Sequence, residues 1–433
     1  MKGSGELQST NHWTRPYPRM IPMILGKAVL VLGVGLLVGV GLIPYVAAND
    51  TGLARSRFVL TSLDSVGKVG LYTSVTIGAD RLGLISYQDV TNRALKVAHC
   101  SNQACSSATL TTLDSAGEVG QYTSVTIGAD RLGLISYQDV TNRSLKVAHC
   151  SDPACSSATL TTLDDIGDVG QTTSVTIGTD GLGLISYHDV TNGNLKVAHC
   201  SNRACTSAIL TILDSAGEVG QYTSVTIGAD GLGLISYYDA TNRNLKVAHC
   251  SNRLCTSAKL ATLDSTGNVG LDTSVTIGAD GLGLISYYDA TNRNLKVAHC
   301  SNQLCTSARL STLDTAGEVG QDTSVTIAAD GLGLISYRDV ANGTLKVAHC
   351  SNRACTSATL ATLDNAGEVG QDTSVIIGDD GLALISYHDV TNGTLKVAHA
   401  PISPAFLTTA VPEQLGNTRS PHLKQRRKSM ATR

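Results

Sequence analysis

The chain contains an internal repeat with a period of 50 residues, and this repeat constrains the fold more than any single residue does. The motif LISYxD occurs seven times, from Leu84–Asp89 to Leu384–Asp389, and the motif LKVAH follows it each time. A chain of 433 residues could otherwise contain two or three ordinary domains. The regular period predicts one closed or stacked array of repeats instead.

Each repeat contains four short runs with the composition of β-strands. Typical copies read TSVTIGAD, GLGLISYYD, LKVAHC and LTTLD, and all four runs are rich in Val, Ile, Thr, Leu or Ala. Asp-Gly pairs such as Asp230-Gly231 separate the first two runs, and Asn-Gly or Asn-Arg pairs separate the next two. Asp-Gly favours a tight hairpin because Gly accepts a positive φ. Arg81 and Arg131 replace this Gly in the first two copies, which predicts a small local strain there.

Seven units of four antiparallel strands predict an all-β fold, a seven-bladed β-propeller, with TSVTIGAD innermost and LTTLD outermost in each blade. An open solenoid is the alternative, and it would need polar caps at its two ends. The array instead opens with a lone outermost strand, Phe58–Asp64, and ends with the other three strands, Thr373–His399. Together these two ends make one blade by one-plus-three strand closure. We therefore expect one closed ring over residues 58–400.

The 12 cysteines form six C-x4-C pairs, one in each hairpin between the third and the outermost strand. Opposed strand residues in a non-hydrogen-bonded pair have Cα atoms about 4.5 Å apart, which is within disulfide range. The composite blade has Ala400 and Arg55 in these columns, so both cysteines are missing together where the ends should meet. The expected disulfides are Cys100–Cys105, Cys150–Cys155, Cys200–Cys205, Cys250–Cys255, Cys300–Cys305 and Cys350–Cys355.

Histidine and aspartate columns also recur in every repeat, and we interpret them as structural. His99 and Cys100 are adjacent in a strand and point to opposite faces, so they cannot easily share a metal ion. The histidine column is therefore expected to pack between blades. Asp89 and its equivalents precede an Asn by three positions, as in Asx turns, and Asp64 and its equivalents are expected in turns too. Calcium-loop spacing is absent, so no metal and no cofactor are predicted.

The N-terminal segment has the pattern of an export signal. Basic residues precede the apolar run 28–42, and small residues at 46–48 offer a cleavage site. We interpret residues 1–48 as a signal peptide or, alternatively, as a membrane anchor formed by residues 21–43. Residues 49–57 are interpreted as a linker. Both interpretations place the repeats outside the cytoplasm, because the basic end stays inside.

The charge distribution argues against a nucleic-acid partner. The net charge is −3, only 15% of the residues are charged, and no basic stripe runs along the repeats. The tail 401–433 contains Pro and the basic run Lys424–Lys428, and we expect it to be disordered and solvated. A membrane contact is expected only through an uncleaved N-terminal anchor. We expect the protein to be a monomer.

No catalytic motif of the G-x-S-x-G, H-E-x-x-H, Walker or Rossmann type is present. The expected architecture distantly resembles sialidase-type propellers, whose repeats carry a Ser-x-Asp-x-Gly-x-x-Trp box. This chain lacks the box, and its single tryptophan, Trp13, precedes the repeats. Near-identical blades also argue against a catalytic centre, which needs different groups around one substrate.

The LISYxD and LKVAHC units resemble secreted bacterial propellers with recently duplicated blades. The resemblance covers Phe58–Ala400 and implies an architecture only, because one fold supports many functions. The first hypothesis for function is an exported recognition module for a glycan or another cell-surface ligand. The second is a disulfide-braced structural envelope protein without a small ligand. A sialidase-like glycosidase is a third and less favoured alternative.

A ligand site is expected where the near-identical copies differ. One such column precedes the Asp of LISYxD, and another lies in the loop before TSVT, on the same rim of the ring. The side chains there are aromatic or hydrogen-bonding, and such groups suit polar ligands such as sugars. Drift at exposed loops is the alternative, since the opposite rim also varies, as at Arg203 and Arg253. If each blade binds weakly, several blades engaging together would supply the affinity. The expected ligand contacts are Tyr72, Gln88, Tyr122, Gln138, His188, Tyr222, Tyr238, Tyr288, Arg338 and His388.

Overall fold

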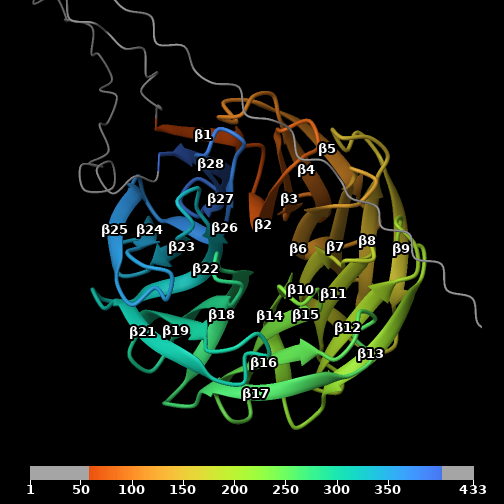
Figure 1. Cartoon of the computed structure of the whole chain (residues 1–433). Coiled ribbons are helices and arrows are strands. Elements are labelled where there is room, and N and C mark those ends of the chain that lie inside the picture. Colours follow the sequence, from red (N-terminus) through yellow and green to blue (C-terminus); the bar gives the residue numbers. More distant parts are fainter. Residues whose placement is uncertain (1–57, 402–433) are drawn as a thin grey trace, which may run out of the picture. The chain divides into compact units, whose positions relative to one another are not determined.

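A computed structural model describes residues 58–401, which form 28 β-strands. These strands make seven separate four-stranded antiparallel sheets. Figure 1 shows the sheets arranged as blades around a ring, with the first strand of each blade on the inside. The all-β seven-bladed propeller that the repeat predicts is therefore confirmed. The predictions for residues 1–57, including Arg55, and for the tail 402–433 lie outside the described residues.

Each blade contributes one strand to each of four concentric positions. The innermost strands are β2 (Val69–Ile77), β6 (Val119–Ile127), β10 (Val169–Ile177), β14 (Val219–Ile227), β18 (Val269–Ile277), β22 (Val319–Ile327) and β26 (Val369–Ile377). The second strands are β3 (Gly83–Asp89), β7 (Gly133–Asp139), β11 (Gly183–Asp189), β15 (Gly233–Asp239), β19 (Gly283–Asp289), β23 (Gly333–Asp339) and β27 (Ala383–Asp389). The third strands are β4 (Ala94–Cys100), β8 (Ser144–Cys150), β12 (Asn194–Cys200), β16 (Asn244–Cys250), β20 (Asn294–Cys300), β24 (Thr344–Cys350) and β28 (Thr394–Ala400). The outermost strands are β5 (Ala108–Asp114), β9 (Ala158–Asp164), β13 (Ala208–Asp214), β17 (Ala258–Asp264), β21 (Ala308–Asp314), β25 (Ala358–Asp364) and β1 (Val59–Asp64).

The ring closes through a composite blade. Strand β1 pairs antiparallel with β28, with Val59 opposite His399, and so completes the sheet of β26, β27 and β28. In Figure 1 the orange β1 lies beside the blue β28. We number the blades from blade 1 (β2–β5) to blade 6 (β22–β25), and the composite blade is blade 7. One-plus-three closure is confirmed.

The blades pack face to face, so the second strands are buried on both sides. Every residue of β3 is buried, and Tyr87 is fully inaccessible to water. Close packing between blades also explains one glycine of the repeat. Gly120 has φ +83°, and a Cβ atom there would lie 2.8 Å from the Cα atom of Leu95 in the preceding blade. A larger residue would therefore push two blades apart.

The six predicted disulfides are present, but their geometric basis differs from the expectation. The Cα atoms of Cys100 and Cys105 are 4.8 Å apart. Cys100 opposes Ala108 in the sheet, whereas Cys105 lies in the preceding turn with φ +48°. The expected pairing of opposed strand residues is therefore wrong, and each bridge fastens a turn to the end of a third strand. Six disulfides suggest an extracytoplasmic protein, because disulfides persist in oxidising compartments. Residues 58–401 include no helix long and apolar enough to span a membrane.

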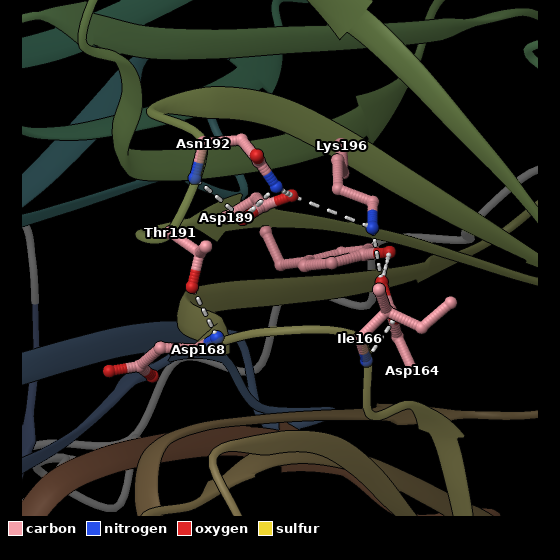
Figure 2. A network of polar contacts seen from close by, with 8 residues as sticks. Asp164, Ile166, Asp168, Asp189, Thr191, Asn192 and Lys196 are labelled. Carbon is pink, nitrogen blue, oxygen red and sulfur yellow. Dashed lines mark hydrogen bonds and ion pairs between the residues drawn. The ribbon is translucent and has the colours of Figure 1, made fainter.

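A buried ion-pair network joins each blade to the next, as Figure 2 shows for blades 2 and 3. Asp164 ends the outermost strand of blade 2, and its carboxylate accepts hydrogen bonds from Lys196 Nζ at 2.5 Å and Tyr187 Oη at 2.7 Å, both in blade 3. Lys196 also lies 3.7 Å from Asp189 of its own blade. The backbone N–H of Asn192 donates to Asp189 at 3.1 Å, which confirms the Asx turn. This network of one Asp, one Tyr and one Lys, which we call the clasp, occurs at all seven junctions between blades.

Each residue of the histidine column contacts an aspartate of its own blade, which the packing interpretation did not foresee. His99 Nε2 lies 2.7 Å from Asp80 Oδ2 in the first hairpin of the same blade. His99 opposes Leu84 in the sheet, and Leu84 packs over Gly133 of the next blade. Opposed residues share a face of the sheet, so the ring also faces the neighbouring blade.

Candidate functional site

A cavity of about 500 Å³ lies on the axis of the ring, surrounded by the inner strands. One column of the repeat supplies a lining residue from every blade, and the next residue in each copy, a threonine, also lines the cavity. This axial column consists of Tyr72, Tyr122, Thr172, Tyr222, Asp272, Asp322 and Asp372.

The axial column lies inside the inner strands rather than in the loop where the sequence pattern placed it. In blade 1 the register between β2 and β3 shifts between Leu71 and Ser74, so Tyr72 lies at a β-bulge. Bulges redirect side chains, and here the bulge turns one residue of each blade toward the axis. The inner strand begins at Val69, four residues before the predicted TSVT run.

All seven residues of the axial column have φ between +47° and +53°. Glycine adopts this conformation easily, whereas bulky or β-branched residues do so at a cost of roughly 1–2 kcal/mol. In two other columns with positive φ, some copies have glycine, such as Gly181 where others have Arg81, and Gly193 where others have Arg93. The cysteine column has no glycine because its side chain forms the disulfide. The axial column has no glycine either, although its side chains form no covalent bond that would require a residue other than glycine.

Three consecutive blades place carboxylates at the cavity. The backbone N–H of Asp322 donates a hydrogen bond to Asp272 Oδ2 at 3.2 Å, and the backbone N–H of Tyr72 donates to Asp372 Oδ2 at 2.9 Å. Burial raises the pKa of Asp272 and of Asp372 to about 6. Burial also raises the pKa of Asp322 well above its usual value, and the negative charges of Asp372 and Asp272 raise it further.

The other side of the axial column is aromatic. The rings of Tyr72 and Tyr122 meet with centroids 4.5 Å apart at an interplanar angle of 47°. The ring of Tyr222 lies 6.2 Å from that of Tyr238. Burial raises the pKa of Tyr222 to about 12, so its hydroxyl stays protonated and can donate hydrogen bonds at neutral pH.

The second predicted column, before the Asp of LISYxD, mostly joins neighbouring blades. Gln88 and His188 are each only 2% exposed, and His388 is fully buried. Of this column, only Tyr288 also lines the cavity. Each side chain of this second column makes a polar contact with the next blade. These contacts are Gln88–Val119 O, Gln138–Asp168, His188–Glu218, Tyr238–Asn268, Tyr288–Glu318, Arg338–Glu368 and His388–Val69 O.

The structure thus brings Tyr72, Tyr122, Tyr222 and Tyr288 together in one cavity, and it separates the remaining predicted contacts from it. Thr172 and the three aspartates were not among the expected ligand contacts, although they stand in the same column as the predicted tyrosines. That shared column was the available signal. Among residues 58–401, no cluster of three or more His, Cys, Asp or Glu side chains could hold a metal ion.

Comparisons with known proteins establish the fold and no family. The chain matches no protein-family profile, and no curated protein matches its sequence. Among solved structures, it is similar to hydrazine synthase of Kuenenia stuttgartiensis, with a TM-score of 0.55, 11% identity, and coverage of 78% of this chain and 98% of that chain. A protein of unknown function from Dyadobacter fermentans matches with a TM-score of 0.50, 10% identity, and coverage of 78% and 97%. NanB sialidase of Streptococcus pneumoniae matches with a TM-score of 0.46, 9% identity, and coverage of 79% and 70%. At these identities the likeness extends to the propeller architecture alone.

Proposed function

We propose that this protein is an exported recognition module that binds a polar ligand, in the first place a glycan, in the single axial cavity. The observation that carries the proposal is the axial column. Its side chains differ between otherwise similar blades, yet all seven keep a backbone conformation that favours glycine. Strain of this kind persists where the surrounding fold imposes it, and it concentrates at functional sites.

The size and the lining of the cavity support a small polar ligand. Its volume of about 500 Å³ lies within the range of ligand pockets, which is about 300–1,000 Å³. Tyrosine rings such as Tyr72 offer a flat surface for a sugar ring, while Asp322 and the threonine hydroxyls offer hydrogen bonds. The expectation of seven weak sites, one on each blade, is thereby replaced by a proposal of one composite site.

Export and anchoring belong to the same proposal. The disulfides support an extracytoplasmic location, and residues 21–43 would hold the protein at the membrane if the segment is not cleaved. The resemblance to secreted bacterial propellers with duplicated blades agrees with this assignment. A cell-surface glycan would be accessible to either form.

Glycan hydrolysis is a second candidate, because the aspartates have the property of a general acid. Their raised pKa values keep a proton available near neutral pH, as glycosidase acids require. Hydrolysis would require one of these carboxyls to donate its proton to the glycosidic oxygen of the bound sugar, while a second carboxylate takes a proton from the water that attacks the anomeric carbon. Product analysis after long incubation with a bound glycan separates the two functions, since a recognition module leaves the glycan intact.

A glycan array with the purified protein tests the proposal. We expect discrete binding that is lost when Tyr72 and Tyr122 are both replaced by Ala. Replacing Arg203 and Arg253, on the opposite rim, should leave binding unchanged. Binding to no glycan, or equal loss from both pairs of substitutions, would favour the structural envelope function instead.

A further inference from the structure

The distribution of charge in the axial cavity indicates the chemical class of its ligand. Asp272, Asp322 and Asp372 come from blades 5, 6 and 7, so their carboxylates form one continuous acidic arc. Among the described residues, no lysine or arginine lines the cavity. Arg338 acts on Asp322 and Asp372, and Lys68 acts on Asp372, but neither cation lines the cavity, and the Arg338 guanidinium lies 3.6 Å from Glu368 of the next blade. The acidic arc therefore lacks a cation of its own within the cavity.

A second observation, independent of the acidic arc, also indicates a ligand. Thr172 belongs to the axial column in blade 3, across the ring from the acidic arc. Its Oγ1 atom is shielded from water and has no hydrogen-bond partner within residues 58–401. A buried hydroxyl without a partner costs free energy, and of the four such Ser and Thr hydroxyls among residues 58–401 only that of Thr172 belongs to a residue lining the cavity. Thr172 also has φ +47°, which a β-branched residue rarely adopts.

We propose that the ligand is an amino sugar oligomer with free ammonium groups, which contact the acidic arc while its sugar rings lie against Tyr72 and Tyr122. This inference rests on the proposed function and specifies its ligand. An ammonium group supplies three donors and a positive charge, and the three aspartates have no positively charged partner in the lining of the cavity.

The spacing of the carboxylates favours an organic cation over a metal ion. No three acidic side chains of the described chain approach closely enough to share one metal ion. The aspartates instead extend over three blades, and an oligomer with several ammonium groups can contact them in series. Burial raises the pKa of all three carboxyls, and no lysine or arginine of the described residues lines the cavity to offset their negative charge.

Titration calorimetry of the full chain with two matched probes tests the inference. The first probe is the β-1,4-linked trisaccharide of glucosamine, with three free amino groups, and the second is the same trisaccharide fully N-acetylated. We expect the amino form to bind at least roughly tenfold more tightly, as a charge-assisted hydrogen bond predicts. Equal or tighter binding of the acetylated form would overturn the inference and leave the proposed function intact. Failure of the amino form to bind would also overturn it.

Variants locate the effect in the acidic arc. Asp322→Asn keeps the shape and removes one charge, and we expect it to weaken binding of the amino trisaccharide by roughly tenfold. Asp165→Asn is the matched control, because Asp165 is exposed in the loop before β10 and does not line the cavity. An unchanged urea unfolding midpoint at pH 7 for the control and a cooperative transition for Asp322→Asn establish that both variants fold. Equal effects of the two substitutions would show non-specific attraction and overturn the inference. Spermidine is the third probe, and binding as tight as that of the trisaccharide would rule out the sugar contacts.

Discussion

The backbone N–H of Tyr72 donates a hydrogen bond to the carboxylate of Asp372 at 2.9 Å, although the two residues are 300 positions apart. This bond crosses the junction between blade 1 and blade 7, where the ring closes. It also joins the aromatic side of the axial column, which begins at Tyr72, to the acidic arc, which ends at Asp372. Closure of the ring and assembly of the cavity therefore occur together.

The acidic arc should make the stability of the protein depend on pH between about 4 and 6. The pKa values of Asp272 and Asp372 are raised to about 6, so the folded state holds protons that the unfolded chain releases near its ordinary value of 3.8. The contribution of these protonated carboxyls to the unfolding free energy is fully present below pH 4 and is lost as the pH rises through 6. Because these side chains are partly exposed, we expect Asp322→Asn to raise the unfolding free energy at pH 8 by only about 1 kcal/mol.

Urea unfolding at pH 4 and pH 8 measures this effect, with Asp165→Asn as the control. The increase in unfolding free energy of the Asp322→Asn variant should disappear at pH 4, where the native carboxyl is protonated. A gain of equal size at both pH values would show that charge is not its cause.

Each clasp should contribute strongly to the cohesion of the ring. Replacing Asp214 by Ala leaves Lys246 and Tyr237 of the next blade without their buried acceptor. Loss of one member of a buried ion pair costs about 3–5 kcal/mol of unfolding free energy. Denaturant unfolding measures this loss. The control substitution Asp165→Ala, on an exposed loop, should change the unfolding free energy by less than about 0.5 kcal/mol. A loss below 1 kcal/mol in Asp214→Ala would contradict the role of the clasp.

The clasps should also make the protein lose stability at acidic pH. Burial disfavours the charged form of Asp214, but hydrogen bonds from Lys246 and Tyr237 outweigh burial and hold its pKa below the usual value. A lowered pKa gives stability that is present above pH 4 and is lost as the pH falls through the folded value. The Asp214→Asn variant should therefore lose less stability than the native protein between pH 5 and pH 2. An acid unfolding curve that is parallel in the two proteins would disprove this source of acid sensitivity.

The disulfides should stabilise each blade locally. Replacing Cys200 and Cys205 together by Ala removes one bridge of 4.8 Å Cα separation, and we expect a loss of about 2 kcal/mol from the chain-entropy estimate. Peptide mapping of the native protein by mass spectrometry should find only pairs within a blade. A peptide that links Cys200 to a cysteine of another blade would contradict the strand arrangement.

Thr172→Gly tests whether the Thr172 side chain serves ligand binding rather than the stability of the fold. Glycine accepts the φ of +47° at this position and removes the unpartnered hydroxyl, so the substitution should leave stability unchanged or raise it by up to about 1 kcal/mol. The same substitution should weaken ligand binding. Thermal unfolding measures stability, and a loss above 1 kcal/mol would assign Thr172 a structural role instead.

The sequence predicted the architecture well because the repeat carries that information seven times. Strand number, closure and disulfide pairing followed from the period, from the split blade at Phe58 and His399, and from the cysteine columns. The clasp was missed because Asp164 belongs to one blade and Tyr187 and Lys196 to the next, and only the packing of adjacent blades brings them together.

The site was predicted only in part, and the reason is geometric. Tyr72 was expected on an outer loop because the short run TSVT gave no sign that the strand begins at Val69. The bulge that turns the column inward depends on the pairing of β2 with β3, which sequence alone does not show. Consequently the column that contains Asp322 was placed on the rim of the ring with one weak site for each blade, whereas in the ring its residues converge on one axis.

The stoichiometry of ligand binding tests whether the axial column forms one binding site. Titration calorimetry with the tightest-binding short oligosaccharide from the array should give one ligand per chain, because the seven residues of the axial column form one cavity. The double substitution of Tyr72 and Tyr122 by Ala should abolish this binding while the protein stays folded. A stoichiometry near seven, with affinity retained in that variant, would show that the blades bind separately and would contradict the account.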